Sequence, residues 1–378
     1  MTSPRLRVAM LAQQYYPLLG GAERQIMSLA PLLVARGVDI VVLTRQYPGL
    51  QRYEELQGVP VHRLPIPGPK IVKSMMYTYA AQSVLARVQP DVLHAHELLS
   101  PTTTAIIAKR RLKIPVLAKV LRGGTYGDLA RIHQKPFAKR RLRTIRNGVD
   151  VFVSISTEIT LELRDHSIAD ERIRFIPNGV DTDRFSPVDD AARVRIRKEL
   201  DQINGPIAVY TGRFVPEKRV DQLVEVWPLV RTEFPDATLF LLGTGSETQK
   251  LMDLAGDGVH FVGQVDDVVS YLRVANAFVL PSVAEGLSNA MLEAMATGAP
   301  VVVTRVGGAP DLVDDGVSGC MIPPDSPDHL RDAILALFRD PAKQTSYGAQ
   351  ARKRVLKDYA LSVTADRLVA LYRELARR

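Results

Sequence analysis

The sequence predicts an α/β protein built from two domains, each formed around an open, mainly parallel β-sheet. Short apolar segments of strand length alternate with helix-length segments along both halves, which is the order that parallel sheets require. The chain has 378 residues, of which 46% are hydrophobic. At roughly 100–200 residues per domain, this is enough chain for two hydrophobic cores. The alternation begins again after residue 205, so one α/β half is expected to follow another.

The first half opens with a strand that leads into a helix and then into a second strand. A segment rich in Pro and Gly, from 44 to 69, is expected to be a loop. The expected strands lie at 6–11, 38–43, 92–95, 115–121 and 151–155, and the expected helices at 22–35, at 74–88 and from about 101.

The second half repeats this alternation and then ends in helices. A helix is expected at 220–230, and further helices from about 327 to the end of the chain. The expected strands lie at 207–210, 238–242, 260–262, 277–280, 300–303 and 319–322.

Composition suggests where one domain ends and the next begins. Residues 183–205 contain Pro187, an Asp pair and a charged helix-like piece, which is typical of a linker, so the hinge is expected there. We therefore expect domains at 1–185 and 186–360. Residues 361–378 are expected to form a C-terminal helix that packs back on the first domain.

Charge is distributed unevenly along the chain, whose net charge is +8. Residues 1–185 hold 27 Lys and Arg against 15 Asp and Glu, a balance of +12, and the remainder holds 22 against 26, a balance of −4. A basic half either keeps a surface solvated or gathers phosphate groups or anionic lipids.

Several protein classes are disfavoured at this point. No apolar run approaches the roughly 18 residues that span a bilayer, and residues 1–5 lead into a strand rather than into the apolar segment of a signal peptide. A cytoplasmic location is therefore expected. The single cysteine, Cys320, cannot form an internal disulfide, and its apolar neighbours predict a buried structural thiol.

The first candidate site is the Gly20-Gly21-Ala22-Glu23 loop between the opening strand and its helix. Glycines let a backbone approach a ligand closely, and the helix N-terminus offers unpaired N–H groups to a phosphate. A plain tight turn would use the same residues, so both interpretations stay open.

The second candidate is the pair Arg213 and Lys218, which follows the first strand of the second half. Residues beyond the carboxyl end of such a strand point into the crevice where open α/β sheets bind ligands. A guanidinium and an ammonium together could neutralise a departing diphosphate. The alternative is two solvated surface cations.

The third candidate is the stretch from Glu285 to Glu293, which follows an apolar strand and a Pro-Ser turn. Glu285 lies in a loop, and Glu293 lies about two turns into a helix that begins near Ser288. Both carboxylates could then face one cleft, with the helix N-terminus between them aimed at an anion. Two acids at this spacing also occur on solvated faces.

These motifs occur in the order found in a known family. The chain resembles the family 4 retaining glycosyltransferases of GT-B fold, in which two Rossmann-like domains with parallel sheets face each other across a central cleft. The resemblance is strongest from Thr211 to Pro323 and covers nearly the whole chain. It rests on Gly212, Arg213 and Lys218; Leu242 to Gly245; Phe261 to Gly263; Pro281 to Ala294; and, upstream, on 20–23, 91–96, 154–156 and 176–181.

The resemblance implies roles for the residues that match. The second domain would bind a nucleotide sugar and the first an acceptor. Arg213 and Lys218 would grip the donor diphosphate, Glu285 would face the transferred sugar, and Glu293 would bind the ribose. The other implied donor contacts are Gly21 from the first domain, Gly212, the 263–265 stretch with Gly263 and Val265 along the base, and Gly286, Leu287, Ser288 and Asn289 around the phosphates.

One position departs from the family pattern. Many members carry a histidine where this chain has Leu121, at the end of the strand expected at 115–121. Arg122, Asp128 or His96 could contact the sugar or the acceptor in its place. His94 and His96 also invite a metal interpretation, but residues two apart on a strand provide two ligands and no clear third. Neither a metal nor another cofactor is expected, because Arg and Lys supply the positive charge in this family.

Two basic segments, 109–113 and 133–146, mix cations with apolar residues. Such segments can lie on an anionic bilayer, which makes the membrane surface an expected partner. Nucleic acid is not expected, since no recognised binding motif or aromatic stacking platform is present.

The function expected from these observations is transfer of a hexosyl group from a nucleoside diphosphate sugar to a hydroxyl acceptor, with the anomeric configuration retained. UDP is favoured over GDP, and the acceptor is expected to be a lipid-linked or cell-envelope glycan. The nearest alternative is a sugar-nucleotide epimerase or a phosphorylase of the same fold. A non-catalytic membrane-binding protein would explain the basic half of the chain. It would leave the arrangement of Glu285 and Glu293 with Arg213 and Lys218 unexplained.

A dinucleotide oxidoreductase is disfavoured, although both halves look Rossmann-like. Gly243-Thr244-Gly245 is followed by Thr248 where the G-x-G-x-x-G motif requires a glycine.

Overall fold

The computed structural model describes residues 5–377 except 19, 67, 69, 202 and 203. The first four residues, which bear on the expectation about a signal peptide, lie outside that part. The chain divides into two compact units: the first is Met1–Asn178 with Leu361–Arg378, and the second is Gly179–Ala360. The boundary therefore lies before the expected one at 185, and the segment 183–205, expected to be a hinge, lies inside the second unit.

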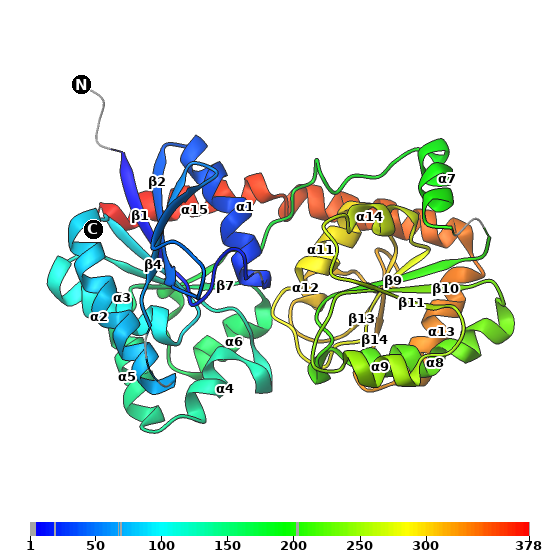
Figure 1. The fold of residues 1–378 in the computed structure, drawn as a ribbon, viewed down its shortest axis with the longest axis horizontal. Helices are drawn as coiled ribbons and strands as arrows, with labels where there is room; N and C mark the ends of the chain where they lie inside the picture. The colour runs from blue at the N-terminus through cyan, green and yellow to red at the C-terminus, as the bar shows by residue number, and fades with distance from the viewer. Residues whose placement is uncertain (1–4, 19, 67, 69, 202–203, 378) are drawn as a thin grey trace. The chain divides into compact units, whose positions relative to one another are not determined.

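The first unit is an eight-stranded sheet in the order β3-β4-β2-β1-β5-β6-β7-β8, covered by helices on both faces (Figure 1). Its strands are β1 (Leu6–Leu11), β2 (Val38–Arg45), β3 (Tyr53–Leu56), β4 (Val59–Leu64), β5 (Val92–His96), β6 (Val116–Lys119), β7 (Val151–Ser154) and β8 (Ile173–Phe175). Its helices are α1 (Gly21–Ala35), α2 (Lys70–Val88), α3 (Ser100–Leu112), α4 (Asp128–His133), α5 (Ala138–Gly148), α6 (Thr157–Asp165) and α15 (Leu361–Ala376), with short 3₁₀ turns η1 (Gly124–Tyr126) and η2 (Asp170–Arg172).

The expectation that 44–69 is a loop was wrong for much of the segment. Strands β3 and β4 form an antiparallel hairpin there, and β4 extends the parallel sheet beside β2. Both turn residues, Gln57 and Gly58, have positive φ, which is the backbone that a two-residue hairpin needs.

Helix α15 comes from the end of the chain and packs beside α1 on one face of the first sheet. Its Tyr372 lies in the same core as Val8, Leu33 and Val92. The Tyr372 hydroxyl also lies 2.6 Å from Nδ1 of the buried His94 on β5. The C-terminal residues thus complete the core of a unit that was begun at the other end of the chain.

The second unit is a six-stranded parallel sheet in the order β11-β10-β9-β12-β13-β14. Helices α8, α9 and α13 cover one face, and α10, α11 and α14 the other (Figure 1). The strands are β9 (Ile207–Thr211), β10 (Thr238–Leu242), β11 (Val259–Gly263), β12 (Ala277–Leu280), β13 (Val301–Thr304) and β14 (Cys320–Ile322). The helices are α7 (Asp190–Glu199), α8 (Val220–Glu233), α9 (Thr248–Leu254), α10 (Val269–Val274), α11 (Asn289–Ala296), α12 (Ala309–Leu312), α13 (Pro327–Phe338) and α14 (Pro341–Asp358), with the 3₁₀ turn η3 (Pro216–Lys218).

The charged helix-like piece expected within 183–205 is α7, whose Arg193 donates hydrogen bonds to the carbonyls of Val274 and Ala275, so α7 is anchored to its unit. One local expectation in this unit was wrong. Cys320 is half-buried rather than buried, and its partial burial raises the pKa of the thiol.

The loops after β9 and β10 contact each other backbone to backbone. The Gly212 N–H donates to Leu242 O, at 2.9 Å, and the Phe214 N–H donates to Thr244 O, at 3.0 Å. Gly243 has φ +137°, and a Cβ there would overlap the carbonyl oxygen of Gly212. Glycine is required here because only its backbone can approach so closely in that conformation.

We therefore predict that Gly243→Ala lowers the apparent melting temperature, by an amount corresponding to about 1 kcal/mol or more, because the added methyl group must force the two loops apart. Gly256→Ala is the matched control, since a Cβ at Gly256 meets no atom within 4 Å. Differential scanning fluorimetry compares the two variants with wild type. Equal melting temperatures for all three proteins would contradict this account of the loop contact.

Candidate active site

The second sheet has its topological switch point between β9 and β12. From β9 the chain proceeds to β10 on one side, and it later returns to place β12 on the other side. Open α/β sheets bind ligands in the crevice outside the carboxyl ends of the strands at such a point. The loop after β9 carries Arg213 and Lys218, and the loop after β12 carries Glu285. The fold therefore brings together three predicted residues that are separated in sequence.

An ion pair between Lys218 Nζ and Glu285 Oε1 connects these two loops. The same carboxylate oxygen accepts a hydrogen bond from Ser282 Oγ at 2.8 Å. The side chains of Lys218 and Glu285 are 15% and 12% exposed, so the pair is only partly screened by water. An ammonium held in this way is positioned to meet an anionic ligand at the sheet edge.

Backbone contacts fix the loop that carries the two cations. The Tyr210 hydroxyl donates to the carbonyl oxygen of Arg213 at 3.0 Å, and the Val283 N–H donates to Glu217 O at 2.9 Å. Burial, and then the charge of Glu285, raise the pKa of Tyr210 well above its ordinary value. Tyr210 therefore keeps its proton, and its hydrogen bond to the loop, at neutral pH.

Arg213 differs from Lys218 in its surroundings. Its side chain is 56% exposed, and its guanidinium lies 3.8 Å from Glu217 Oε1, which is a loose ion pair. An exposed guanidinium with a loose partner can turn toward a diphosphate at little cost.

Two glycines, Gly307 and Gly308, pack against the loop from Glu285 to Leu287. The Gly308 N–H donates to Gly286 O at 2.6 Å. A Cβ at Gly307, where φ is +58°, would lie 2.5 Å from Glu285 O. The glycines thus permit the close approach that holds Glu285 in place.

Helix α11 begins directly after this loop. Ser288 is its N-cap, and the Ser288 hydroxyl accepts a hydrogen bond from the Met291 N–H at 3.3 Å. Glu293 is half-buried in the second turn, one turn after Asn289, so the two residues lie on the same side of the helix. The loop after β12 and the first two turns of α11 therefore carry both predicted carboxylates.

Gly263 and Val265 lie at the same edge but farther along it. Gly263 ends β11 with φ +78°, and its carbonyl accepts a hydrogen bond from the Gly243 N–H at 2.8 Å. Because β11 lies next to β10, which adjoins β9, this stretch is two strands away from Arg213.

The other predicted residues belong to the first unit. Gly21 is the first residue of α1 and is exposed. The N-terminus of α1 is capped by the Glu23 carboxylate, which accepts a hydrogen bond from the Gly20 N–H at 2.9 Å. Arg122 is half-buried after β6. These two residues stay candidates for ligand contacts.

His96 and Asp128, two of the residues expected to contact the sugar or the acceptor, are both buried, and that role stays a prediction. The His96 ring stacks on His94 with centroids 4.1 Å apart, and burial lowers the pKa of both imidazoles, so they are neutral. Asp128 is 1% exposed and accepts hydrogen bonds from the N–H groups of Leu98 and Leu121. It anchors the loop that contains Leu121.

Within the described residues, no group of three or more His, Cys, Asp or Glu side chains is arranged to hold a metal ion. The described part of the chain also contains no helix with the length and apolar character of a membrane span.

Sequence reasoning missed the residues that hold the site in shape. Ser282, Tyr210 and Gly307 were not singled out. Ser282 and Tyr210 each bond to a residue three positions farther along the chain, Glu285 and Arg213, whereas Gly307 contacts the backbone of the loop after β12. A serine three residues before Glu285 was a usable signal, since a hydroxyl at that spacing can reach the carboxylate of the same loop. For Gly307 no local signal existed, because its contact is with the loop that follows a different strand, β12.

Two family models match the chain, one in each half. Residues 19–184 match the model described as Glycosyltransferase Family 4, and residues 205–340 match the model described as Glycosyl transferases group 1. Together they include the candidate site and the loop that contains Gly21.

Curated relatives match along nearly the full chain. A GDP-mannose-dependent alpha-(1-6)-phosphatidylinositol monomannoside mannosyltransferase of Mycobacterium tuberculosis is 28% identical over 389 residues, covering 97% of this chain and 98% of that protein. A phosphatidyl-myo-inositol mannosyltransferase of Mycobacterium leprae is 26% identical, covering 98% of this chain and 97% of that protein.

Solved structures share the fold. Sucrose-phosphate synthase from Thermosynechococcus elongatus has a TM-score of 0.85 at 24% identity, covering 98% of this chain and 99% of that one. HepE from Anabaena, in complex with UDP and glucose, has a TM-score of 0.83 at 18% identity, covering 98% of this chain and 100% of that one. With its two parallel-sheet α/β units and its match to both family models, this chain belongs to the family 4 glycosyltransferases of GT-B fold.

Proposed function

We propose that the protein transfers a mannosyl group from GDP-mannose to a hydroxyl of a phosphatidylinositol-type glycolipid, with retention of the anomeric configuration. The choice of GDP over the expected UDP is supported by the names of the mycobacterial relatives, which specify GDP-mannose. The acceptor class is supported by the same names. The observation that carries the reaction is the Lys218–Glu285 pair at the β9/β12 switch point, with Arg213 beside it on the same loop.

The proposed chemistry follows from the charges at that edge. When the bond between the sugar and the diphosphate breaks, negative charge builds up on the leaving phosphate. Lys218 and Arg213 would offset that charge, with help from the N–H groups at the start of α11. The reaction is proposed to need no metal ion, because these groups supply the positive charge.

Glu285 and Glu293 would hold the two ends of the donor. Glu285 is oriented by Lys218 and Ser282, so a sugar hydroxyl would meet a carboxylate that is already fixed in direction. Glu293 would accept hydrogen bonds from ribose hydroxyls. Attack by the acceptor on the same face as the leaving group would keep the configuration, with the departing phosphate helping to accept the acceptor's proton.

We predict that Arg213→Ala and Lys218→Ala each reduce turnover of GDP-mannose by at least about tenfold, or about 1.4 kcal/mol of transition-state stabilisation. Arg213→Ala is the cleaner variant because its side chain is exposed, whereas Lys218→Ala leaves Glu285 without its cation. Lys250→Ala is the control, since Lys250 is an exposed ion-paired lysine of the same unit. Near-normal turnover in both test variants, measured with purified proteins, would refute the assignment.

Stereochemistry separates this proposal from an inverting transferase. An inverting enzyme needs a general base on the face opposite the leaving group. We predict instead a product with the anomeric configuration of the donor, read from the anomeric coupling of fresh product by nuclear magnetic resonance. Glu285→Gln should lower turnover more than donor affinity, and Glu293→Gln should mainly weaken donor binding. An inverted product would exclude retention, and an isomerised or phosphorolysed donor would favour an epimerase or a phosphorylase.

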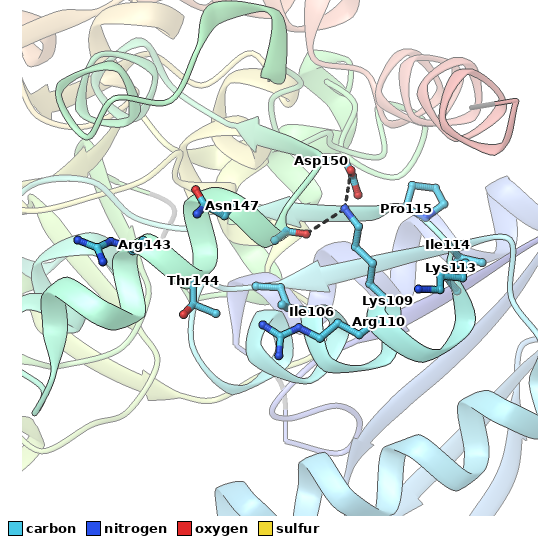
Figure 2. Close-up of a pocket in the computed structure, with 11 residues that line it drawn as sticks. Ile106, Lys109, Arg110, Lys113, Ile114, Pro115, Arg143, Thr144, Asn147 and Asp150 are labelled. Atoms are coloured by element: carbon cyan, nitrogen blue, oxygen red, sulfur yellow. Dashed lines mark hydrogen bonds and ion pairs between the residues drawn. The ribbon is translucent and has the colours of Figure 1, made fainter.

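The proposed acceptor places the enzyme at a membrane, and the first unit offers a basic surface for it. A hollow of about 620 Å³ lies between α3 and α5, on the side where β6 and β7 begin (Figure 2). Lys109 is occupied there, with its ammonium 2.6 Å from Asp150 Oδ1 and 3.2 Å from Gly148 O. The remaining basic residues that line the hollow are Arg110, Lys113 and Arg143.

The segment leading into α5 adds an apolar side chain to these cations. Phe137 is 81% exposed, and Ile145 is the buried residue of α5, whose other residues are half-buried or exposed. Each cation near an anionic bilayer contributes roughly 1 kcal/mol, and one exposed aromatic ring can enter the interface. We propose that this surface docks on an anionic membrane.

We predict that the protein floats with vesicles that contain anionic phospholipid and that binding weakens as salt is raised. The triple variant Arg110→Glu, Lys113→Glu, Arg143→Glu should lose this binding. The matched control is Arg195→Glu, Lys198→Glu, Lys357→Glu, which makes the same change of net charge in the second unit, at exposed positions. Equal binding to neutral and anionic vesicles, or equal losses in both triple variants, would contradict the proposed surface.

A further inference from the structure

The first sheet has a switch point of its own, and it carries a carboxylate that no role above explains. In the order β2-β1-β5-β6, the chain runs from β1 to β2 on one side and later places β5 on the other. Gln13 lies just beyond the end of β1, and Glu97 directly follows β5. Glu97 thus holds the position in the first sheet that the loop of Glu285 holds in the second.

The Glu97 carboxylate is held from two sides and still has capacity to bind. Gln13 Nε2 donates to Oε2 at 2.7 Å, and Arg131 NH1 donates to Oε1 at 3.0 Å. A carboxylate has about four acceptor positions, so each oxygen can accept a further hydrogen bond. The Glu97 side chain is 12% exposed and that of Arg131 is 49% exposed, so the group reaches solvent. A carboxylate flanked by amide and guanidinium donors is suited to ring hydroxyls, which both donate and accept.

The backbone of Glu97 is strained, and the fold holds the strain in place. Its φ is +85°, a conformation that a residue with a Cβ rarely adopts. Its N–H donates to Lys119 O at 3.0 Å, and its carbonyl accepts from the hydroxyl of buried Thr102 at 2.7 Å. A glycine would adopt this backbone conformation without strain. The strain at this position therefore accompanies the glutamate side chain.

The charged neighbours of Glu97 come from α4 and β2. Burial, and then the charge of Asp128, raise the pKa of Glu97 to about 7, while Arg131, Gln13 and Arg45 act in the opposite direction. Asp128 already accepts two backbone N–H groups. Arg45 donates to Ser100 Oγ at 3.0 Å and lies over the Tyr77 ring. Of the two carboxylates, Asp128 is occupied by backbone N–H groups, whereas Glu97 can still accept hydrogen bonds from a ligand.

We propose that Glu97, together with Gln13 and Arg131, binds a pair of ring hydroxyls of the acceptor, a sugar or cyclitol, and positions the acceptor on the first unit. This inference rests on the proposed function, because it concerns the acceptor of the same transfer. Hydroxyls of the donor's own sugar present the same chemistry, so the experiment separates the two sources.

The test compares acceptor and donor kinetics in the purified full-length chain. GDP-mannose is the donor, and phosphatidylinositol and its monomannoside, dispersed in detergent micelles, are the acceptors. Glu97→Gln and Glu97→Gly should each raise the acceptor KM by about tenfold or more, while the donor KM stays within about twofold. Glu97→Gly should melt no lower than wild type because glycine relieves the strain, so it decides the matter if Glu97→Gln folds poorly. Glu171→Gln, an exposed glutamate of the same unit, is the matched control.

Three results would overturn the inference in distinguishable ways. An unchanged acceptor KM in a folded Glu97 variant refutes the acceptor site and leaves the proposed function intact. A rise in the donor KM instead assigns the carboxylate to the donor's sugar. If wild type transfers mannose to neither acceptor, the proposed function fails, and this site fails with it.

Discussion

The Lys218–Glu285 ion pair is the interaction on which the geometry of the candidate active site depends. It joins the loop after β9 to the loop after β12, and Ser282 and Tyr210 hold one loop each. The hydroxyl of Thr304, at the end of β13, donates to the Ser282 carbonyl, so a third strand end supports the same arrangement. Burying either charge without its partner is costly. The ion pair therefore holds the two loops together, and the two loops in turn keep the two charges in contact.

The sheets of the two units have the same strand order around their switch points. The order β4-β2-β1-β5-β6-β7 in the first sheet corresponds to β11-β10-β9-β12-β13-β14 in the second. In each sheet, the strand that lies beyond the switch point ends in a loop with a glutamate, Glu97 or Glu285. The partners of these carboxylates differ: Glu285 is paired with the Lys218 ammonium and accepts from the Ser282 hydroxyl, whereas Glu97 is paired with the Arg131 guanidinium and accepts from the Gln13 amide. We infer that one topology supplies a donor site and an acceptor site by exchanging loop residues.

Sequence patterns predicted most of the fold because the buried strands are apolar and the loops after them are rich in glycine and charge. Arg213, Lys218 and Glu285 could be placed at one sheet edge because each follows a recognisable strand. The hairpin at 53–64 was missed because β3 is half exposed and its residues, such as Glu54 and Glu55, look like loop. The burial of His96 and Asp128, the supporting role of Gly307 and the strained backbone at Glu97 depend on contacts between distant segments. Such contacts leave no local pattern in a single sequence.

Hydrogen–deuterium exchange, followed by mass spectrometry, with and without saturating GDP-mannose, tests most directly whether the donor binds at the β9/β12 switch point. We expect slower amide exchange at residues 212–218 and 286–293 when GDP-mannose is bound, because their loops and the start of α11 would enclose the diphosphate. The slowing should be reduced in Arg213→Ala at the same concentration of GDP-mannose. Unchanged exchange in both segments of wild type, under conditions where calorimetry shows that GDP-mannose is bound, would contradict the placement of the donor at the β9/β12 switch point.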